Sequence, residues 1–323
     1  SSILMLCFSA QICFGAPQSE SSLEQGLKLL SQGRFPAAIS LFNQCKQTNP
    51  QDARPYFYAG LALTEAGRLS AAALEVDEAV RLDPERLEAL VLQANLFTRL
   101  KQKTPAEDAL ARLQEQSAAE RLEASWLWML SDSYYRLERF PEVLRLLELL
   151  EKRNPNDPHL DLNRGQVFVF QSQFEQAQKA FQTSITKHPT NALAHFELGK
   201  LLHLRNDLPA AKTALREAVR LEPNNAQYLQ KLGAVCLARR EVDEAIVHLE
   251  RAVTSDPNSS QAFYSLSQAY QRNGKREKAT GLMRQFQELK QREEAREEVE
   301  RTLARGERML DEGNDTEARA AFE

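Results

Sequence analysis

A segment of 34 residues recurs along the chain, and this repeat limits the possible folds more than any other feature of the sequence. Residues 53–86, 192–225 and 226–259 align without a gap. Most of the segments have a proline near their end, and two of these prolines, Pro223 and Pro257, are also 34 residues apart. Periods of this length are typical of elongated arrays, in which each unit contacts only its neighbours.

The repeats can be delimited along almost the whole chain, with two shifts of phase. Three residues are inserted after the third repeat and five after the eighth, and neither of these repeats has a closing proline. We therefore expect irregular stacking at those two junctions. The predicted repeats are 19–52, 53–86, 87–120, 124–157, 158–191, 192–225, 226–259, 260–293 and a partial ninth at 299–323.

Glycine occupies two positions of the repeat in ten of its 12 occurrences. At the eighth position, as at Gly199 and Gly233, the missing side chain lets two helices approach closely. At the fifteenth position, as at Gly33 and Gly67, glycine supplies a left-handed residue that ends a helix at little steric cost. Each repeat is therefore predicted to contain two helices joined by a tight turn.

Apolar residues between these glycines recur at helical spacing. The repeat at 192–225 has two apolar stripes, formed by Leu198, Leu201 and Leu202 and by Ala211, Leu215 and Ala218. A short helix cannot bury such a stripe alone, so the helix pairs must stack on one another. We predict that the chain beyond about residue 20 is almost entirely helical and has no β-sheet.

The pattern resembles the tetratricopeptide repeat, which places Leu-Gly, two alanines and a proline at these spacings. The matching residues in two of the repeats are Leu198-Gly199, Ala211, Ala218 and Pro223, and Leu232-Gly233, Ala245, Ala252 and Pro257. The resemblance covers residues 19–323. It implies an all-α fold, a right-handed α-solenoid of stacked antiparallel helix pairs whose first helices line a concave groove.

The eighth repeat is predicted to end in a long helix. Nine of the 12 residues at 290–301 are charged, and the surrounding sequence is rich in strong helix formers. We expect the second helix of this repeat to run past residue 293. The mixed signs of the charges favour a solvated helix with pairs such as Glu297–Arg301 over an interaction face.

The first residues of the chain are typical of a secretory signal peptide that lacks its beginning. The run from Ile3 to Phe14 is largely apolar but too short to span a bilayer, and Gly15 suits the position before a cleavage site. We predict a signal peptide at 1–15, a linker at 16–18 and the repeats from residue 19. The alternative is the remnant of a longer membrane anchor. Together with the resemblance, the signal predicts an exported bacterial protein, periplasmic or secreted, without stable membrane insertion after cleavage.

Composition and motifs argue against nucleic-acid binding and catalysis. The net charge of −4 lacks the basic excess of nucleic-acid binders. No phosphate-binding loop, zinc motif or nucleophile motif occurs, and His195 and His203 are about 12 Å apart along one helix, too far to share a metal. Cys45 and Cys236 occupy core positions in distant repeats, so we expect buried thiols outside any disulfide. We predict no enzyme activity, no cofactor and no metal site.

The resemblance also implies which side chains line the groove, because the family binds its ligands through fixed positions of the first helices. The residues at those positions include Asn95, Arg99, Trp128, Asp132, Tyr135, Arg136, Gln166, Phe196, Lys200, His203, Tyr264, Gln268 and Arg272. Aromatic rings mixed with amide and cationic donors suit an extended peptide. Phe57 occupies such a position as well, and the alternative for Phe57 and Phe196 is packing against the neighbouring repeat.

The densest group of these side chains lies on the first helix of the fourth repeat. Trp128, Asp132 and Tyr135 are four and three residues apart, so they project from one helical face. Arg99 and Gln166 hold equivalent positions in the repeats before and after. The alternative is that Trp128 or Tyr135 fills the irregular joint behind the third repeat.

These observations predict a non-catalytic scaffold that binds other proteins or extended peptides. One alternative is the repeat region of a larger enzyme, or of a secretion or assembly machine, whose working domain lies beyond residue 323. Another is a structural module that associates with itself through its convex face or its open ends.

Overall fold

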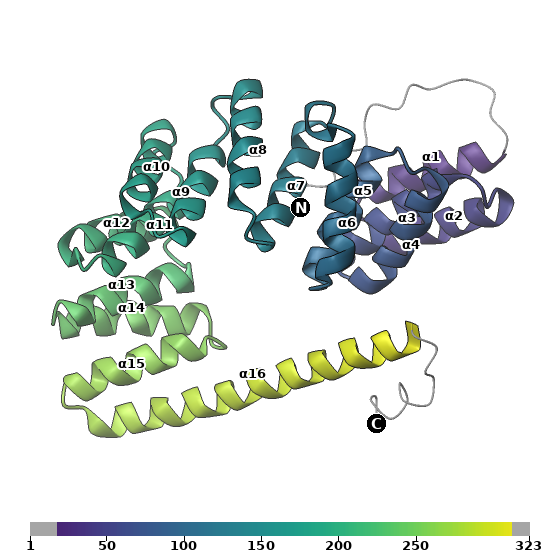
Figure 1. The fold of residues 1–323 in the computed structure, drawn as a ribbon. Coiled ribbons are helices and arrows are strands. Elements are labelled where there is room, and N and C mark those ends of the chain that lie inside the picture. The colour runs from purple at the N-terminus through teal and green to yellow at the C-terminus, as the bar shows by residue number, and fades with distance from the viewer. Residues whose placement is uncertain (1–17, 312–323) are drawn as a thin grey trace. The chain divides into compact units, whose positions relative to one another are not determined.

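The computed structural model describes residues 18–311, and the described chain is helical, without a β-strand. The predicted all-α fold is therefore confirmed. The predicted signal peptide at 1–15 and residues 312–323 lie outside the described residues. The chain divides into two compact units, with the boundary after Leu160 in the first turn of α9. Figure 1 labels the helices of both units.

Over its described residues, from residue 18 onward, the first unit contains four helix pairs and one short 3₁₀ helix. Its elements are α1 (Gln18–Ser31), α2 (Phe35–Thr48), α3 (Ala53–Glu65), α4 (Leu69–Leu82), α5 (Leu87–Arg99), α6 (Lys103–Glu115), η2 (Ala118–Glu120), α7 (Ala124–Arg136) and α8 (Phe140–Arg153). The two helices of each pair pack against each other, and α2 and α4 also pack on the next pair. The first helices α5 and α7 lie side by side (Figure 1).

The second unit repeats this arrangement and ends in a long helix. Its helices are α9 (Leu160–Phe170), α10 (Phe174–Lys187), α11 (Ala192–Leu204), α12 (Leu208–Leu221), α13 (Ala226–Ala238), α14 (Val242–Ser255), α15 (Ser260–Arg272) and α16 (Arg276–Asp311). A continuous apolar core connects α11 through α16 and includes the buried thiol of Cys236. Cys45 is buried in the first unit, and neither cysteine forms a disulfide, as predicted.

The close approach predicted at the eighth repeat position is confirmed. A Cβ atom added to Gly26 would lie 2.5 Å from a ring carbon of Phe42. One added to Gly233 would lie 2.5 Å from Cγ of Leu249. Glycine at this position therefore allows the second helix of the pair to place a large apolar side chain directly on the backbone of the first.

The fifteenth repeat position adopts the left-handed conformation whether or not it is glycine. Gly33, Gly67 and Gly274 have φ of 73°, 76° and 81°. The same position in other repeats holds side chains with φ between 58° and 64°, namely Lys101, Glu138, Ser172, Asn206 and Arg240. The turn between the two helices thus requires a positive φ that glycine adopts most easily.

Substitution by glycine at this position is expected to stabilise the protein. Arg240→Gly and Glu138→Gly should each raise the free energy of unfolding by up to about 1 kcal/mol, because a left-handed conformation costs an L-residue roughly that much. Gly67→Ala is the matched control and should lower it. Thermal denaturation of the single variants measures both effects. A loss of stability in both glycine variants would show that the side chains stabilise the turn more than its backbone strains them.

The insertion after the third repeat forms a local irregularity, as predicted. It contains η2, preceded by Ser117 with φ of 48°. Arg153 at the end of α8 holds this segment, donating to the carbonyl oxygens of Leu122 and, at 2.9 Å, Glu120. A pocket of about 180 Å³ remains beside η2, with Tyr134 in its lining.

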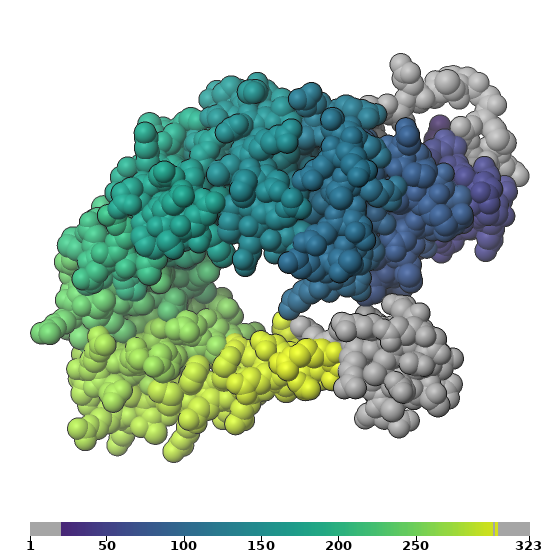
Figure 2. All heavy atoms as spheres, in the orientation of Figure 1, coloured from purple at the N-terminus to yellow at the C-terminus, as the bar shows by residue number. Residues whose placement is uncertain are grey.

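The last helix confirms the prediction of a helix that runs past residue 293. α16 is 36 residues long and continues from the eighth repeat into the predicted ninth. Its first part packs against α15, whereas its second part extends away from the rest of the unit (Figures 1 and 2). Glu297 and Arg301 form the predicted ion pair at 3.6 Å. None of the helices described between residues 18 and 311 has the length and apolar content that a membrane-spanning helix needs.

Candidate functional site

The predicted binding residues lie on the first helices of the repeats. In the first unit these helices form a series of contacts from α1 to α3, α5 and α7. In the second unit α11 contacts α13, and α13 contacts α15. Side chains on one first helix can therefore combine with those on the next within each unit, which is the geometry that an extended ligand requires.

Four of the predicted residues lie on α7, and we call Trp128, Asp132, Tyr135 and Arg136 the α7 surface. The first three side chains are half-buried and Arg136 is exposed. The Trp128 ring contacts His159 edge to face, with 6.0 Å between the centroids. Tyr135 contacts Phe140 in the same way at 6.0 Å. The two aromatic rings are thus held in place while part of each remains accessible.

The carboxylate of Asp132 is fixed from both sides. Arg136 Nε donates to Oδ2 of Asp132 at 2.7 Å, and Nδ2 of Asn95 on α5 donates to the same oxygen at 3.1 Å. Asn95 also donates to the hydroxyl of Ser133 at 3.4 Å and is only 5% exposed. Asn95 was predicted to face a ligand, and this prediction is wrong, because the side chain is buried. Its amide instead orients the carboxylate of Asp132.

A residue that the sequence did not single out fills the core behind the α7 surface. Trp126, two positions before Trp128, is buried and contacts the ring of Phe57 at 5.9 Å. Phe57 is buried as well, with the guanidinium of Arg86 over its face at 4.2 Å. Both tryptophans lie on α7, and the one that packs inward is Trp126, which leaves Trp128 at the surface.

In the second unit, Phe196 does not line a groove. It is 2% exposed and stacks on Tyr228 of the next first helix, with the centroids 4.5 Å apart. Its expected contact with a ligand is therefore wrong, and the alternative of packing against the neighbouring repeat holds. The same packing buries Tyr228, and burial raises the pKa of its hydroxyl to about 12.

A basic group, here called the α11–α13 surface, lies next to this aromatic stack and comprises Lys200, His203 and Lys231. Lys200 pairs with Glu197 at 3.0 Å. Burial and the charge of Lys200 lower the pKa of Lys231, and burial and the charge of Lys231 lower the pKa of His203. Sequence reasoning missed Lys231 because it occupies the sixth repeat position, outside the family's usual binding positions.

The other predicted residues are accessible to different degrees. Arg99, Gln166, Tyr264 and Gln268 are half-buried, and Arg272 is exposed. Tyr264 contacts Phe286 of α16 at 5.2 Å between centroids, and Nη1 of Arg272 donates to the carbonyl of Leu237 at 2.8 Å. Gln166 belongs to the second unit, so its proximity to the α7 surface stays a prediction.

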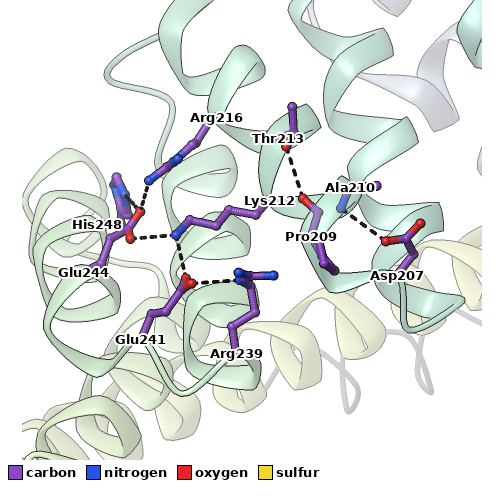
Figure 3. A network of polar contacts seen from close by, with 10 residues as sticks. All are labelled: Asp207, Pro209, Ala210, Lys212, Thr213, Arg216, Arg239, Glu241, Glu244 and His248. Carbon is purple, nitrogen blue, oxygen red and sulfur yellow. Dashed lines mark hydrogen bonds and ion pairs between the residues drawn. The ribbon is translucent and has the colours of Figure 1, made fainter.

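A polar network joins α12 to α14 (Figure 3), and we call it the α12–α14 network. Its centre is Lys212, whose side chain is 11% exposed and donates to Glu241 at 2.6 Å and Glu244 at 2.7 Å. Nη2 of Arg216 donates to the other oxygen of Glu244 at 2.8 Å, and Nε of Arg239 donates to Glu241 at 2.9 Å. The network fastens two successive repeats through charge-assisted hydrogen bonds.

The α12–α14 network makes the stability of the fold depend on pH. Partial burial raises the pKa of Glu244, but hydrogen bonds from Lys212 and Arg216 outweigh it and hold the pKa at about 2, below the usual 4.5. A depressed carboxylate pKa stabilises the fold above pH 4.5, and this contribution is lost as the pH falls towards 2. We expect a loss of about 1 kcal/mol, since solvent screens part of the interaction.

Melting temperatures measured from pH 6 down to pH 2 test this dependence. Glu244→Gln should have a shallower dependence on pH than the wild type, because its amide does not titrate. Glu294→Gln on the exposed part of α16 is the control and should retain the wild-type dependence. Equal slopes for Glu244→Gln and the wild type would contradict the assignment.

Comparison with known proteins agrees with the repeat pattern. Residues 23–86 match a family described as "Tetratricopeptide repeat", and residues 168–293 match "Cilia and flagella-associated protein 70 middle TPR-like domain". Among curated proteins, the chain is 25% identical over 190 residues to the "PEX5-related protein" of Homo sapiens, which covers 56% of this chain and 30% of that protein. The corresponding Mus musculus protein is also 25% identical over 190 residues, covering 56% of this chain and 34% of the relative. The match thus spans about a third of the length of these relatives.

Solved structures share the fold at lower identity. A tetratricopeptide repeat protein from Parabacteroides merdae superposes with a TM-score of 0.62 at 15% identity, covering 78% of this chain and 99% of that one. The APC/C hetero-tetramer Cut9-Hcn1 gives a TM-score of 0.55 at 20% identity, covering 78% of this chain and 51% of that one. The two family matches together cover more than half of the residues, and the helix pairs have the same architecture. The chain belongs to the tetratricopeptide-repeat family.

Proposed function

We propose that this chain is a non-catalytic scaffold that binds extended segments of other proteins through the first-helix surfaces of its repeats. Tetratricopeptide repeats serve protein interaction in general, and the finer proposal rests on the α7 surface. There, two half-buried aromatic rings share one helix with an Asp132 carboxylate that Asn95 and Arg136 hold in one orientation. Pre-oriented aromatic and charged groups cost little entropy on binding, so they favour affinity.

We further propose that the protein acts outside the cytoplasm and does not bind nucleic acid. The apolar segment at the start of the chain and the small residues after it support export to the periplasm or the medium. The net charge of −4 gives no support to nucleic-acid binding. The alternative, a repeat region within a larger machine, is supported by the length of the PEX5-related proteins, about three times that of the matched segment.

Variants of the α7 surface test the binding role with a defined probe. The probe is a peptide selected from a random library against the wild-type protein. Trp128→Ala and Tyr135→Ala should each weaken its binding at least about tenfold, which corresponds to 1.4 kcal/mol. Their melting temperatures should stay close to that of the wild type, because part of each ring is already in water.

A matched control comes from the second helix of another repeat. Leu74 on α4 is an exposed large apolar residue, so Leu74→Ala should leave both affinity and stability unchanged. If both Trp128→Ala and Tyr135→Ala instead destabilise the fold by about 3–5 kcal/mol, the two rings are packing residues. Unchanged affinity in both variants would place the binding surface elsewhere.

A further inference from the structure

Three side chains capable of binding a metal converge between α13 and α14. Cys236 comes from α13 and is fully buried, whereas Glu244 and His248 are four residues apart on one face of α14. One potential ligand atom from each residue lies within 4.8 Å of the other two. Nε2 of His248 lies 3.6 Å from Oε1 of Glu244, and its Nδ1 is buried without a hydrogen-bond partner among the described residues. An unsatisfied imidazole nitrogen is costly in a core and is commonly explained by an absent ion or water.

We propose that Cys236, Glu244 and His248 bind one zinc ion between the two helices of the repeat at 226–259. Zinc accepts cysteine sulfur, histidine nitrogen and carboxylate oxygen as ligands, and three protein ligands with water in the fourth position are an established arrangement. Zinc–ligand bonds of about 2.0–2.3 Å require ligand atoms about 3.3–3.7 Å apart in a tetrahedron. The three ligand atoms lie within 4.8 Å of one another, so binding requires them to approach by at most about 1.5 Å.

The choice of ligands favours zinc over the common hard cations. A thiolate and an imidazole suit zinc, whereas magnesium and calcium take oxygen ligands almost exclusively. On binding, the Cys236 thiol gives up its proton to the solvent and the thiolate sulfur bonds to zinc. The ion enters as Zn²⁺ and stays in that oxidation state, so the step needs no oxidant or reductant.

Lys212 and Arg216 both contact Glu244, and zinc binding requires one of these contacts to change. Lys212 holds Oε2 of Glu244 at 2.7 Å and can stay there, as a donor that orients a ligating carboxylate from outside. Arg216 occupies the other oxygen at 2.8 Å, and its side chain is 57% exposed, so it can swing into solvent. Arg216 therefore competes with zinc for Oε1 of Glu244. Removing its charge should strengthen zinc binding, which a purely structural role of the network would not predict.

Cobalt and zinc titrations of the chelator-treated, reduced full chain test the proposal. Cobalt alone should produce the thiolate-to-metal absorption band, and zinc should displace it at one ion per chain. We expect Cys236→Ala to abolish the band, and Glu244→Gln and His248→Gln each to weaken zinc binding at least about tenfold. Arg216→Gln should bind zinc more tightly than the wild type.

Two control variants separate the site from its surroundings. Cys45→Ser removes the other buried cysteine and should retain the band. Glu241→Gln removes the second carboxylate held by Lys212 without removing a ligand, so zinc affinity should change less than about threefold. Retention of the band in Cys236→Ala would overturn the proposal. If that variant does not fold, unchanged zinc affinity in His248→Gln, whose side chain is partly at the surface, would overturn it equally.

Discussion

Truncation of Phe181 to alanine is expected to lower the free energy of unfolding by about 3–5 kcal/mol. The ring on α10 is fully buried and is the largest member of a cluster with Leu162, Ala194 and Leu201. It lies directly over Gly165 on α9, where no side chain can move in to fill the space. The variant therefore leaves a cavity in addition to losing apolar contacts, and both terms reduce stability.

A second phenylalanine of the same helix pair provides the control. Phe170 at the end of α9 is 61% exposed, so Phe170→Ala should change the free energy of unfolding by less than about 0.5 kcal/mol. Urea denaturation followed by circular dichroism compares the two variants. Similar losses in both variants would contradict the burial of Phe181.

A methyl group added at Gly233 is expected to destabilise the protein by about 1–3 kcal/mol. The new Cβ would lie 2.5 Å from Cγ of Leu249 and 2.8 Å from its Cδ2. Leu249 is fully buried, so it cannot move away without disturbing the core that α13 shares with α14. The strain therefore has to be absorbed by a shift of one helix against the other.

The same substitution elsewhere should have the opposite sign. Gly281 lies within α16, and an added Cβ would have no atom within 4 Å. Gly281→Ala should stabilise the helix by up to about 1 kcal/mol, because alanine has the higher helix propensity. Thermal denaturation of both variants measures the contrast. If Gly233→Ala were as stable as the wild type, the close approach at the eighth repeat position would not be a requirement of the fold.

The helical architecture could be predicted from the sequence because its signals are local and repeated. The turn at each fifteenth position follows from the glycines at Gly33 and Gly67, and the chain keeps that conformation where Arg240 replaces glycine. The length of α16 likewise follows from the missing proline and the strong helix formers at 290–301. Each of these features depends on residues close together in the chain.

The surface residues were harder to predict, since their exposure depends on the side chains of the next repeat. Phe196 is buried because Tyr228 stacks on it, and Asn95 is buried because Asp132 and Ser133 bind its amide. No spacing rule contains this information. The same limit applies to the proposed zinc ligands, because Cys236 and His248 come from two helices and form no recognisable motif.

Site-specific photocross-linking tests binding at the first-helix surfaces most directly. A photoreactive phenylalanine analogue replaces Tyr135 on α7 in one variant and Leu74 on α4 in another, and each is irradiated with the peptide selected against the wild type. If partners bind along the first helices, the peptide cross-links at position 135 and not at position 74. Cross-linking at position 74 with none at position 135 would place the peptide on the second helices and contradict the proposed mode of binding.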